Sequence, residues 1–329
     1  MTDRIRVGVF LASYFPPERN VRDGIASMVD RAQQAEDEGY DSIFLGHHIL
    51  AASQFLQPVP VAAHLAALTS RVRIGFGVYL LPLVNPLVVA EELATIHHLS
   101  DGRFIAGFGA GYREKEFDAV GVPFDQRFKR MEEYIDVVRR LWAGETVTHD
   151  GSFGSLRNAR VNLTTAGGDA PPIWVGAFGD IGIKRSARLG ASWMSGPEGT
   201  LDLLAARLDS WRGWLDHYGH TAPRDVPMVR EVFVADTDEE AIRVARPHLE
   251  AQYSDYKSWD HGLSGDDMVT GHAVVGSPES VATRLNAYRS IGFTEVVVRT
   301  EWPGMDSARV ERSFELLARE VMPRLQGPV

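Results

Sequence analysis

The sequence predicts an α/β protein of the (β/α)8 class, a TIM barrel, with insertions at the face where the strands end. Short β-branched runs alternate with amphipathic helical segments along the whole chain of 329 residues. Several runs, among them VRIGFGVYLL and TEVVVRT, are almost wholly apolar, as parallel strands buried on both faces are. Eight strand–helix alternations fit a closed barrel better than an open doubly wound sheet, which stays the alternative because periodicity does not show closure. No linker or internal repeat divides residues 1–329, so one domain is expected.

The individual elements follow from apolar periodicity and from residues that favour helix ends. The expected strands are 5–11, 42–45, 72–78, 104–108, 172–176, 191–194, 228–235 and 295–299. The expected helices are 23–38, 59–69, 86–98, 127–142, 181–189, 200–218, 238–256, 278–290 and 307–321. Gly190 and Gly292 follow two of these helices, where a left-handed terminal residue favours glycine.

Two connections are longer than those usual in a compact domain. Residues 145–172 have hairpin character, and residues 252–276 form a second long segment. Connections of this length are often lids or binding loops, and barrel active sites are built from the loops that follow the strands. We therefore expect residues 252–276 to form a lid over the site.

Composition excludes several classes of protein. The 34 lysines and arginines stand against 44 aspartates and glutamates, a formal net charge of −10, which disfavours nucleic-acid and anionic-membrane partners. The absence of cysteine excludes disulfides, iron–sulfur clusters, cysteine-ligated zinc and thiol nucleophiles. The first residues contain only a short apolar run, and no run approaches the ~20 residues of a membrane span. A cytoplasmic protein is expected.

The adjacent histidines His47 and His48 are the first candidates for chemistry. They directly follow the second expected strand, which in a barrel places them at the catalytic face. A neutral imidazole can act there as base, acid or hydrogen-bond donor, although a surface-loop histidine is the simpler alternative. Successive side chains point in different directions, so we expect His47 to act and His48 to pack against a loop or the barrel wall. The pair His97 and His98 lies inside a helix, and no metal role is expected there.

Glycines at strand ends indicate close approach of a ligand or of neighbouring backbone. Gly75 and Gly77 interrupt an apolar strand, where glycine often marks a bulge or a tight contact. Gly107, Gly109 and Gly111 follow the fourth strand in GFGAG, which lacks the G-x-G-x-x-G spacing of a dinucleotide site. A flat cofactor ring or its ribityl chain could approach this backbone. Ordinary packing is the alternative.

The segment WVGAFGDIGIKRSARLG predicts a strand, a glycine-rich turn and a helix. The N–H groups of 176–182 at such a helix start form an anion site, so a phosphate could bind there. A merely tight turn is the alternative, and Asp180 counts slightly against an anion. Motifs for zinc hydrolases, EF-hands, serine nucleophiles and P-loops are absent from the sequence, so no metal site is expected.

The ordered segments resemble the bacterial-luciferase-like flavin monooxygenase family over nearly the whole chain. The carrying stretches are AQQAEDEGYDSIFLGHHIL, AALTSRVRIGFGVYLLPLVNPLVVAEELATIHHLSDGRFIAGFGAGYREKEFDAVGVPF, PPIWVGAFGDIGIKRSARLGASWM and VVGSPESVATRLNAYRSIGFTEVVVR. The resemblance implies a (β/α)8 barrel whose catalytic face binds reduced FMN or the deazaflavin F420. His47 matches the first histidine of the family's E-H-H element, with Gly46 in place of the acid. Gly77 and Val78 match a strand-three bulge, often a cis peptide, that packs against the flavin ring.

The same resemblance implies the contacts to the rest of the cofactor. Gly109, Gly111 and Tyr112 match the segment along the ribityl-phosphate side, and Ala110 stands where luciferase has an arginine. The loop 176–182 matches the phosphate loop of the family. Its residues expected to contact the cofactor are Gly176, Ala177, Phe178 and Gly179.

The activity implied is that of a monooxygenase that uses reduced FMN and O2, with His47 stabilising or protonating the oxygenated flavin. A separate reductase is then expected to supply reduced flavin, and helices two and three to form a homodimer face. The first alternative is an F420-dependent oxidoreductase that transfers hydride, in which Arg113 and Lys115 serve the acidic tail of F420. The second is a non-catalytic flavin-binding or partner subunit, which the changes at Gly46 and Ala110 fit.

Aromatic residues in the long loops suggest the kind of substrate. They are Phe55, Phe153, Tyr253, Tyr256 and Trp259, and they indicate a small apolar or aromatic organic compound. The alternative is that the same residues serve ordinary packing.

Overall fold

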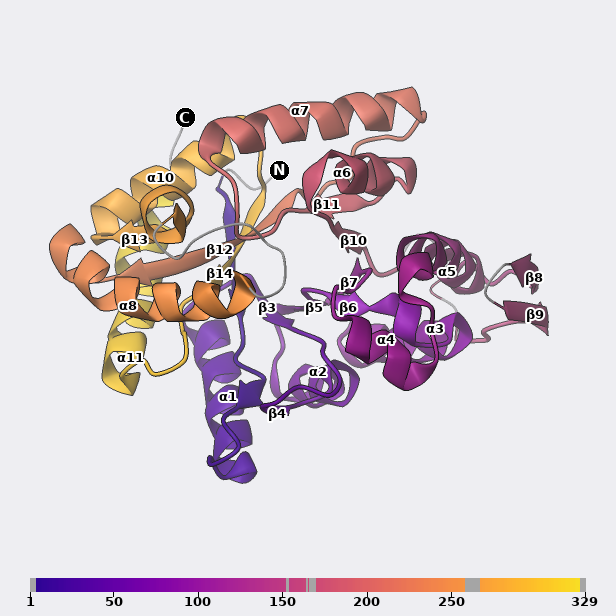
Figure 1. Cartoon of the computed structure of the whole chain (residues 1–329), viewed down its shortest axis with the longest axis horizontal. Helices are drawn as coiled ribbons and strands as arrows, with labels where there is room; N and C mark the ends of the chain where they lie inside the picture. The colour runs from indigo at the N-terminus through magenta and orange to yellow at the C-terminus, as the bar shows by residue number, and fades with distance from the viewer. Residues whose placement is uncertain (1–3, 152–153, 164, 166–169, 258–266, 326–329) are drawn as a thin grey trace. The chain divides into compact units, whose positions relative to one another are not determined.

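Strands and helices alternate along the chain in the computed structural model (Figure 1). The structure describes residues 4–151, 154–163, 165, 170–257 and 267–325. These residues pack as two compact units. Unit 1 comprises Met1–Leu11, Gln34–Ile43 and Ala177–Val329, and unit 2 comprises Ala12–Gln33 and Phe44–Gly176.

All eight expected strands are present, with ends within two residues of the predicted ones. The strands are β1 Arg6–Phe10, β2 Tyr14–Phe15, β3 Ser42–Leu45, β4 Gln54–Phe55, β5 Arg73–Phe76, β6 Tyr79–Leu80, β7 Phe104–Gly109, β8 Val147–Gly151, β9 Gly154–Ala159, β10 Ile173–Gly176, β11 Ser192–Met194, β12 Pro227–Val234, β13 Val274–Gly276 and β14 Glu295–Arg299. The α-helices are α1 Val21–Asp37, α2 Pro58–Leu68, α3 Pro86–Leu99, α4 Glu114–Val120, α5 Arg127–Trp142, α6 Gly179–Arg188, α7 Leu201–His217, α8 Asp238–Lys257, α10 Pro278–Ile291 and α11 Ser307–Leu316.

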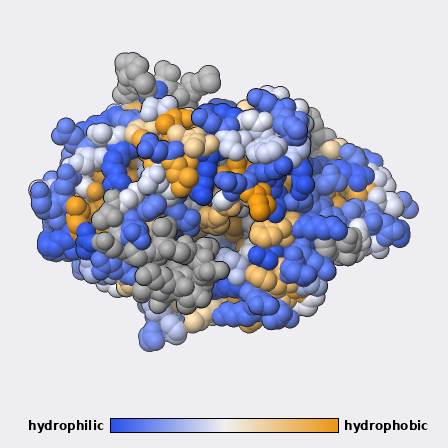
Figure 2. Space-filling view, turned by 45° about the horizontal axis from the view of Figure 1, so that its top comes forward, coloured by the Kyte–Doolittle hydropathy of each residue, from blue (hydrophilic) through white to orange (hydrophobic). Residues whose placement is uncertain are grey.

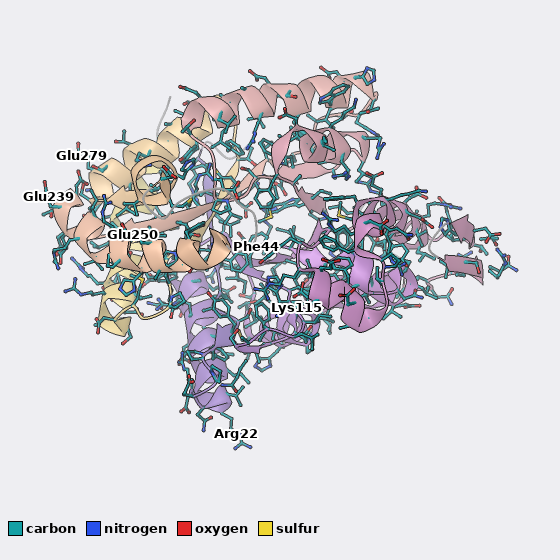
Figure 3. All side chains as sticks on the ribbon, viewed as in Figure 1. Arg22, Phe44, Lys115, Glu239, Glu250 and Glu279 are labelled. Carbon is teal, nitrogen blue, oxygen red and sulfur yellow. The ribbon has the colours of Figure 1, made fainter. Side chains whose placement is uncertain are left out.

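Parallel strands form the centre of unit 2. β5 pairs with β7 and β7 with β10, and the short β6 also pairs with β7. The rings of Phe44 and Trp174 stack at 5.2 Å, and the Arg73 guanidinium lies 5.7 Å from the Trp174 ring centre. Phe44 lies among the strands in Figure 3, whereas Arg22 extends from the outer end of α1. Large aromatic side chains therefore fill the space between these strands.

Unit 1 contains a second set of parallel strands. β14 pairs with β1 on one side and with β12 on the other, while the end of β12 pairs with β13. Arg6 forms ion pairs with Asp225 at 2.5 Å and with Glu295 at 3.0 Å, and Ser42 donates to Glu295 at 2.6 Å. Because these charged groups are buried, each needs the partners it has.

The fold class is therefore an α/β protein with parallel strands, which confirms that part of the prediction. The hairpin predicted within 145–172 is also present, since β8 and β9 pair antiparallel. Of the predicted lid 252–276, residues 258–266 lie outside the described residues. Its described parts are the end of α8, a π turn at Met268–His272 and β13.

The helix α4 is the main element that the sequence did not predict. It spans seven residues, too few for an apolar period to become visible, and Gly121 ends it with a φ of 69°. This short helix matters because it supplies a buried residue of the site, Glu116.

None of the described helices is long and apolar enough to cross a membrane. Hydrophilic residues predominate on the face drawn in Figure 2, and apolar residues form small separate groups there.

Candidate functional site

His47 lies two residues beyond the end of β3 and is 6% exposed. Its ring stacks on Tyr79 with centroids 4.4 Å apart, and its Nδ1 accepts the backbone N–H of Leu80 at 3.1 Å. The pKa of His47 is lowered to about 4, mainly by burial and in addition by the neighbouring His48, while Glu116 and a hydrogen bond with Gln57 oppose the shift. The imidazole is therefore neutral near pH 7. Since Nδ1 is an acceptor, the proton is on Nε2, and His47 is a hydrogen-bond donor.

His48 makes polar contacts in addition to the packing that was predicted for it. Its Nδ1 is 2.8 Å from Oε1 of Glu116, and its Nε2 is 3.4 Å from the hydroxyl of Tyr112. Glu116 is fully buried on α4 and also accepts the backbone N–H of Ile49 at 3.2 Å. The ring of His48 packs against Phe55 and Tyr112, and His48 is in addition part of a polar cluster. Sequence reasoning missed Glu116 because it did not predict α4.

The Gly77–Val78 peptide is cis, as predicted. A Cβ at Gly109 would lie 2.2 Å from Cγ2 of Val78, and one at Gly176 would lie 2.8 Å from Cγ1. Both glycines are therefore required for the packing of Val78 against β7 and β10. Ordinary packing against Val78 therefore explains the glycines at 109 and 176 without a ligand.

Gly111 has a φ of 82° and brings the chain close to the Phe117 ring, 2.9 Å from where a Cβ would lie. Only glycine adopts this conformation without strain. It turns the chain so that the next residue, Tyr112, reaches His48. The preceding residue, Ala110, is 7% exposed. Because it is an alanine, it supplies no cation to a phosphate.

The predicted phosphate loop 176–182 precedes and enters α6, and all of it except Gly176 belongs to unit 1. The helix begins at Gly179, two residues earlier than predicted, and its N-cap residue Phe178 makes no side-chain capping hydrogen bond. Gly179 has a φ of 64° and open space where a Cβ would be, whereas Phe178 is 53% exposed. The Ala177 carbonyl accepts the indole N–H of Trp193 at 3.0 Å, which fixes the turn. This arrangement fits an anion at the helix start.

The predicted site residues therefore divide between the two units. Unit 2 holds the histidine, the cis peptide and the glycine strand ends, namely His47, Gly77, Val78, Gly109, Gly111, Tyr112 and Gly176. Unit 1 holds Ala177, Phe178 and Gly179.

Unit 1 contains a buried polar cluster that the sequence did not reveal. The carboxylate of Glu231, near the end of β12, accepts the hydroxyl of Tyr253 and the indole N–H of Trp302, each at 2.7 Å, and pairs with Arg299. Glu231 is fully buried. The predicted lid aromatic Tyr253 is thereby fixed to β12. Phe153 and Trp259 lie outside the described residues.

A cavity of about 520 Å³ lies in unit 2, between α2 and α3. Tyr79, whose ring also stacks on His47, forms part of its wall together with Glu92 and Val88. Burial raises the pKa of Tyr79 to about 12, and burial also raises the pKa of Glu92. The cavity contains neither His47 nor the glycine strand ends in its lining. Within the described part of the chain, no three acidic or histidine side chains are placed to hold a metal ion.

Parallel strands, a neutral donor histidine at a strand end and an uncapped glycine turn define an α/β protein with a candidate cofactor site. A family model described as luciferase-like monooxygenase matches residues 5–295. The chain belongs to the luciferase-like monooxygenase family, and the resemblance found in the sequence is confirmed. Members of this oxidoreductase family that the chain resembles are named as monooxygenases or as F420-dependent enzymes.

Three relatives illustrate this range. Limonene 1,2-monooxygenase of Rhodococcus erythropolis is 28% identical over 99% of this chain and 89% of its own. F420-dependent glucose-6-phosphate dehydrogenase of Kineococcus radiotolerans is 29% identical over 91% and 93%. The oxygenase component of flavin-dependent trigonelline monooxygenase of Acinetobacter baylyi is 25% identical over 90% and 88%.

A solved structure supports the fold. The oxygenating constituent of 3,6-diketocamphane monooxygenase from Pseudomonas putida, in complex with FMN, has a TM-score of 0.81 at 22% identity. The match covers 99% of this chain and 100% of that one.

Proposed function

We propose that this protein is a flavin-dependent monooxygenase that uses reduced FMN and O2 on a small apolar or aromatic organic substrate. The observation that carries the proposal is the environment of His47. Its imidazole is buried and neutral, and its proton is fixed on Nε2 because Nδ1 accepts from Leu80. The monooxygenases among the relatives support the reaction class. FMN in a protein with the same fold supports the cofactor.

The residues of this chain fit the cofactor at the start of α6. Uncapped helix amides and the open, left-handed Gly179 suit a phosphate, and the helix dipole adds about 1–2 kcal/mol in favourable geometry. Gly77, Val78, Gly109, Gly111 and Tyr112 would border the ring and the ribityl chain. Ala110 offers no arginine to the phosphate, so we expect moderate affinity, with Arg113 as the nearest candidate cation in the sequence.

Reduced FMN, when bound, supplies the electrons that activate O2 for transfer of one oxygen atom to the substrate. The task of His47 is to donate the Nε2–H to the oxygen that becomes negative, without itself losing its proton. Because the pKa of His47 is about 4, it stays a neutral donor throughout the neutral pH range. The surrounding Tyr79 and Leu80 hold the ring in one orientation and exclude water.

Several further features belong to this proposal. The first is the fold: we propose a single (β/α)8 barrel domain for residues 1–329, with residues 252–276 as its lid. Reduced flavin would come from a separate reductase, as the oxygenase component among the relatives suggests. The α2–α3 face, with its cavity and the 46% exposed Val88, would bind a second copy of the chain.

A second function, hydride transfer with F420, is favoured by the F420-dependent relative. In that case Arg113 and Lys115 would serve the acidic tail of F420. Lys115 lies on α4 in Figure 3.

Anaerobic titration of the purified protein with reduced FMN and with reduced F420, followed by admission of O2, tests the proposal. We expect tighter binding of reduced FMN and oxygen consumption that forms product. Binding of F420 alone, without oxygen consumption, would establish the second function. Failure to bind either would establish a non-catalytic subunit.

A further inference from the structure

Three polar side chains of unit 2 form a hydrogen-bonded chain: Tyr112, His48 and Glu116. The carboxylate Oε1 lies 2.8 Å from Nδ1 of His48, and the hydroxyl of Tyr112 lies 3.4 Å from Nε2. The rings of His48 and Tyr112 meet edge to face, with centroids 5.6 Å apart. The residues come from the segment after β3, the segment after β7 and α4, so only the fold brings them together.

The direction of each hydrogen bond follows from the Ile49 amide. That N–H can only donate, and it donates to Oε1 of Glu116 at 3.2 Å, so Oε1 is an acceptor. An ionised carboxylate has no proton to donate, so with Glu116 ionised the contact between Oε1 and Nδ1 of His48 places the proton on Nδ1. His48 Nε2 is left as an acceptor, toward which the hydroxyl of Tyr112 donates. The chain therefore runs from Tyr112 through His48 to Glu116.

We propose that Tyr112 is an acid–base residue of this site and that His48 and Glu116 are positioning residues that carry its proton. When a substrate O–H gives its proton to the oxygen of Tyr112, the hydroxyl proton of Tyr112 moves to Nε2 of His48. His48 becomes an imidazolium beside the carboxylate of Glu116. The reverse sequence returns a proton to a substrate oxygen, and no electrons are transferred. This inference rests on the proposed function for its reaction, and it narrows the substrate to compounds with a hydroxyl or carbonyl oxygen.

Tyr112 and His48 are both partly exposed, whereas Glu116 at the end of the hydrogen-bonded chain is buried. A substrate can therefore reach the phenol, while the far end of the chain is shielded from water. Interactions between charges are strongest where water is excluded, so Glu116 stabilises an imidazolium better than an exposed carboxylate would.

Three neighbouring side chains determine the electrostatic environment of the hydrogen-bonded chain from Tyr112 to Glu116. Arg113 lies 3.8 Å from Oε1 of Glu116 and 5.7 Å from the centre of the Tyr112 ring, a position that favours negative charge on both. His47 is the neighbour on the β3 side and is neutral near pH 7, since its pKa is about 4. Phe55 of β4 packs edge-on against His48 at 5.5 Å and adds no charge.

The two adjacent histidines thus hold opposite tautomers. His47 has its proton on Nε2 because Nδ1 accepts from Leu80, and His48 has its proton on Nδ1 because Glu116 accepts from it. Nitrogen NMR of the cofactor-free protein, with His48→Asn to assign the resonances, measures this directly. We expect a protonated Nδ1 and an acceptor Nε2 for His48. A proton on Nε2 of His48 would overturn the proposal.

Titration of the same cofactor-free protein with phenol, as a small hydroxyl-bearing probe, tests the link to substrate. We expect phenol to shift the Nε2 resonance of His48 in the wild type and in the control Tyr218→Phe. The shift should be lost in Tyr112→Phe, whose tautomer at His48 stays unchanged. A purely structural role for the cluster would give no shift in the wild type, and an equal shift in Tyr112→Phe would remove Tyr112 from the path. Neither measurement uses flavin, so failure of the flavin titration leaves both results interpretable.

Discussion

His47 combines burial with a fixed proton position, and its pKa links it to the stability of the protein. The folded-state pKa of about 4 lies below the ordinary value of 6.5. Between these two pH values the unfolded chain binds a proton at this position that the folded chain does not bind. The free energy of unfolding therefore falls as the pH is lowered through this window.

We expect the wild type to lose about 2 kcal/mol more than His47→Gln between pH 7 and pH 5, since glutamine does not titrate. Urea unfolding at the two pH values measures this difference. The same substitution at the exposed His98 serves as the control and should keep the wild-type pH dependence. If the free energy of unfolding of His47→Gln depended on pH as that of the wild type does, the imidazole of His47 would not be held in its neutral form by burial.

Gly179 is the residue of the α6 turn most open to a test. Its φ of 64° is strained for a β-branched residue, but no neighbouring atom blocks a side chain. Gly179→Val should weaken FMN binding at least about fivefold by distorting the helix start, a loss of ~1 kcal/mol. Gly179→Asn is the matched control, because asparagine adopts this conformation more readily. Equal affinity in both variants and wild type, measured by flavin fluorescence, would remove the turn from the site.

Among the elements, β12, β14 and α8 are joined by a single carboxylate. Glu231 is fully buried and satisfied by Tyr253, Trp302 and Arg299. Neutralising it leaves the charge of Arg299 without its partner, and breaking a buried pair in this way costs about 3 kcal/mol or more.

Glu231→Gln should therefore lower the free energy of unfolding by about 3 kcal/mol, measured by the urea midpoint and slope. The control is Glu240→Gln, which removes exposed pairs with Arg243 and Arg309 and should cost below about 1 kcal/mol. Similar stability of the two variants would show that the Glu231 cluster does not hold α8.

Strand positions could be predicted from the sequence, whereas the buried carboxylates of the site could not. Strands such as β3 and β14 were predicted at their observed bounds. Each is a short, continuous apolar run bounded by polar residues, a pattern typical of a buried strand. Gly77 and Val78 were singled out by glycine in a strand together with the family resemblance. Glu116 and Glu231 could not be found, since their significance depends on partners 68 and 71 residues away in sequence. The packing predicted for His48 is present, but its contact with Glu116 could not be foreseen for the same reason.

At the scale of the whole molecule, the proposed homodimer gives a further test. Val88 is 46% exposed beside the cavity between α2 and α3, and an apolar residue in that position suits a subunit interface. Sedimentation equilibrium should give twice the chain mass of 36.4 kDa for the wild type and the single mass for Val88→Asp. A wild-type monomer, or a dimer unaffected by Val88→Asp, would place any interface elsewhere.

The central claim is that His47 donates a hydrogen bond to oxygen activated at a bound flavin. The most direct measurement is rapid mixing of the protein, loaded with reduced FMN, with O2, following the decay of the oxygenated flavin by its near-ultraviolet absorbance. His47→Ala should bind reduced FMN as the wild type does, yet shorten the lifetime of the oxygenated flavin by about 10- to 1000-fold, the range of one acid–base or electrostatic contributor. An unchanged lifetime in His47→Ala would contradict the account.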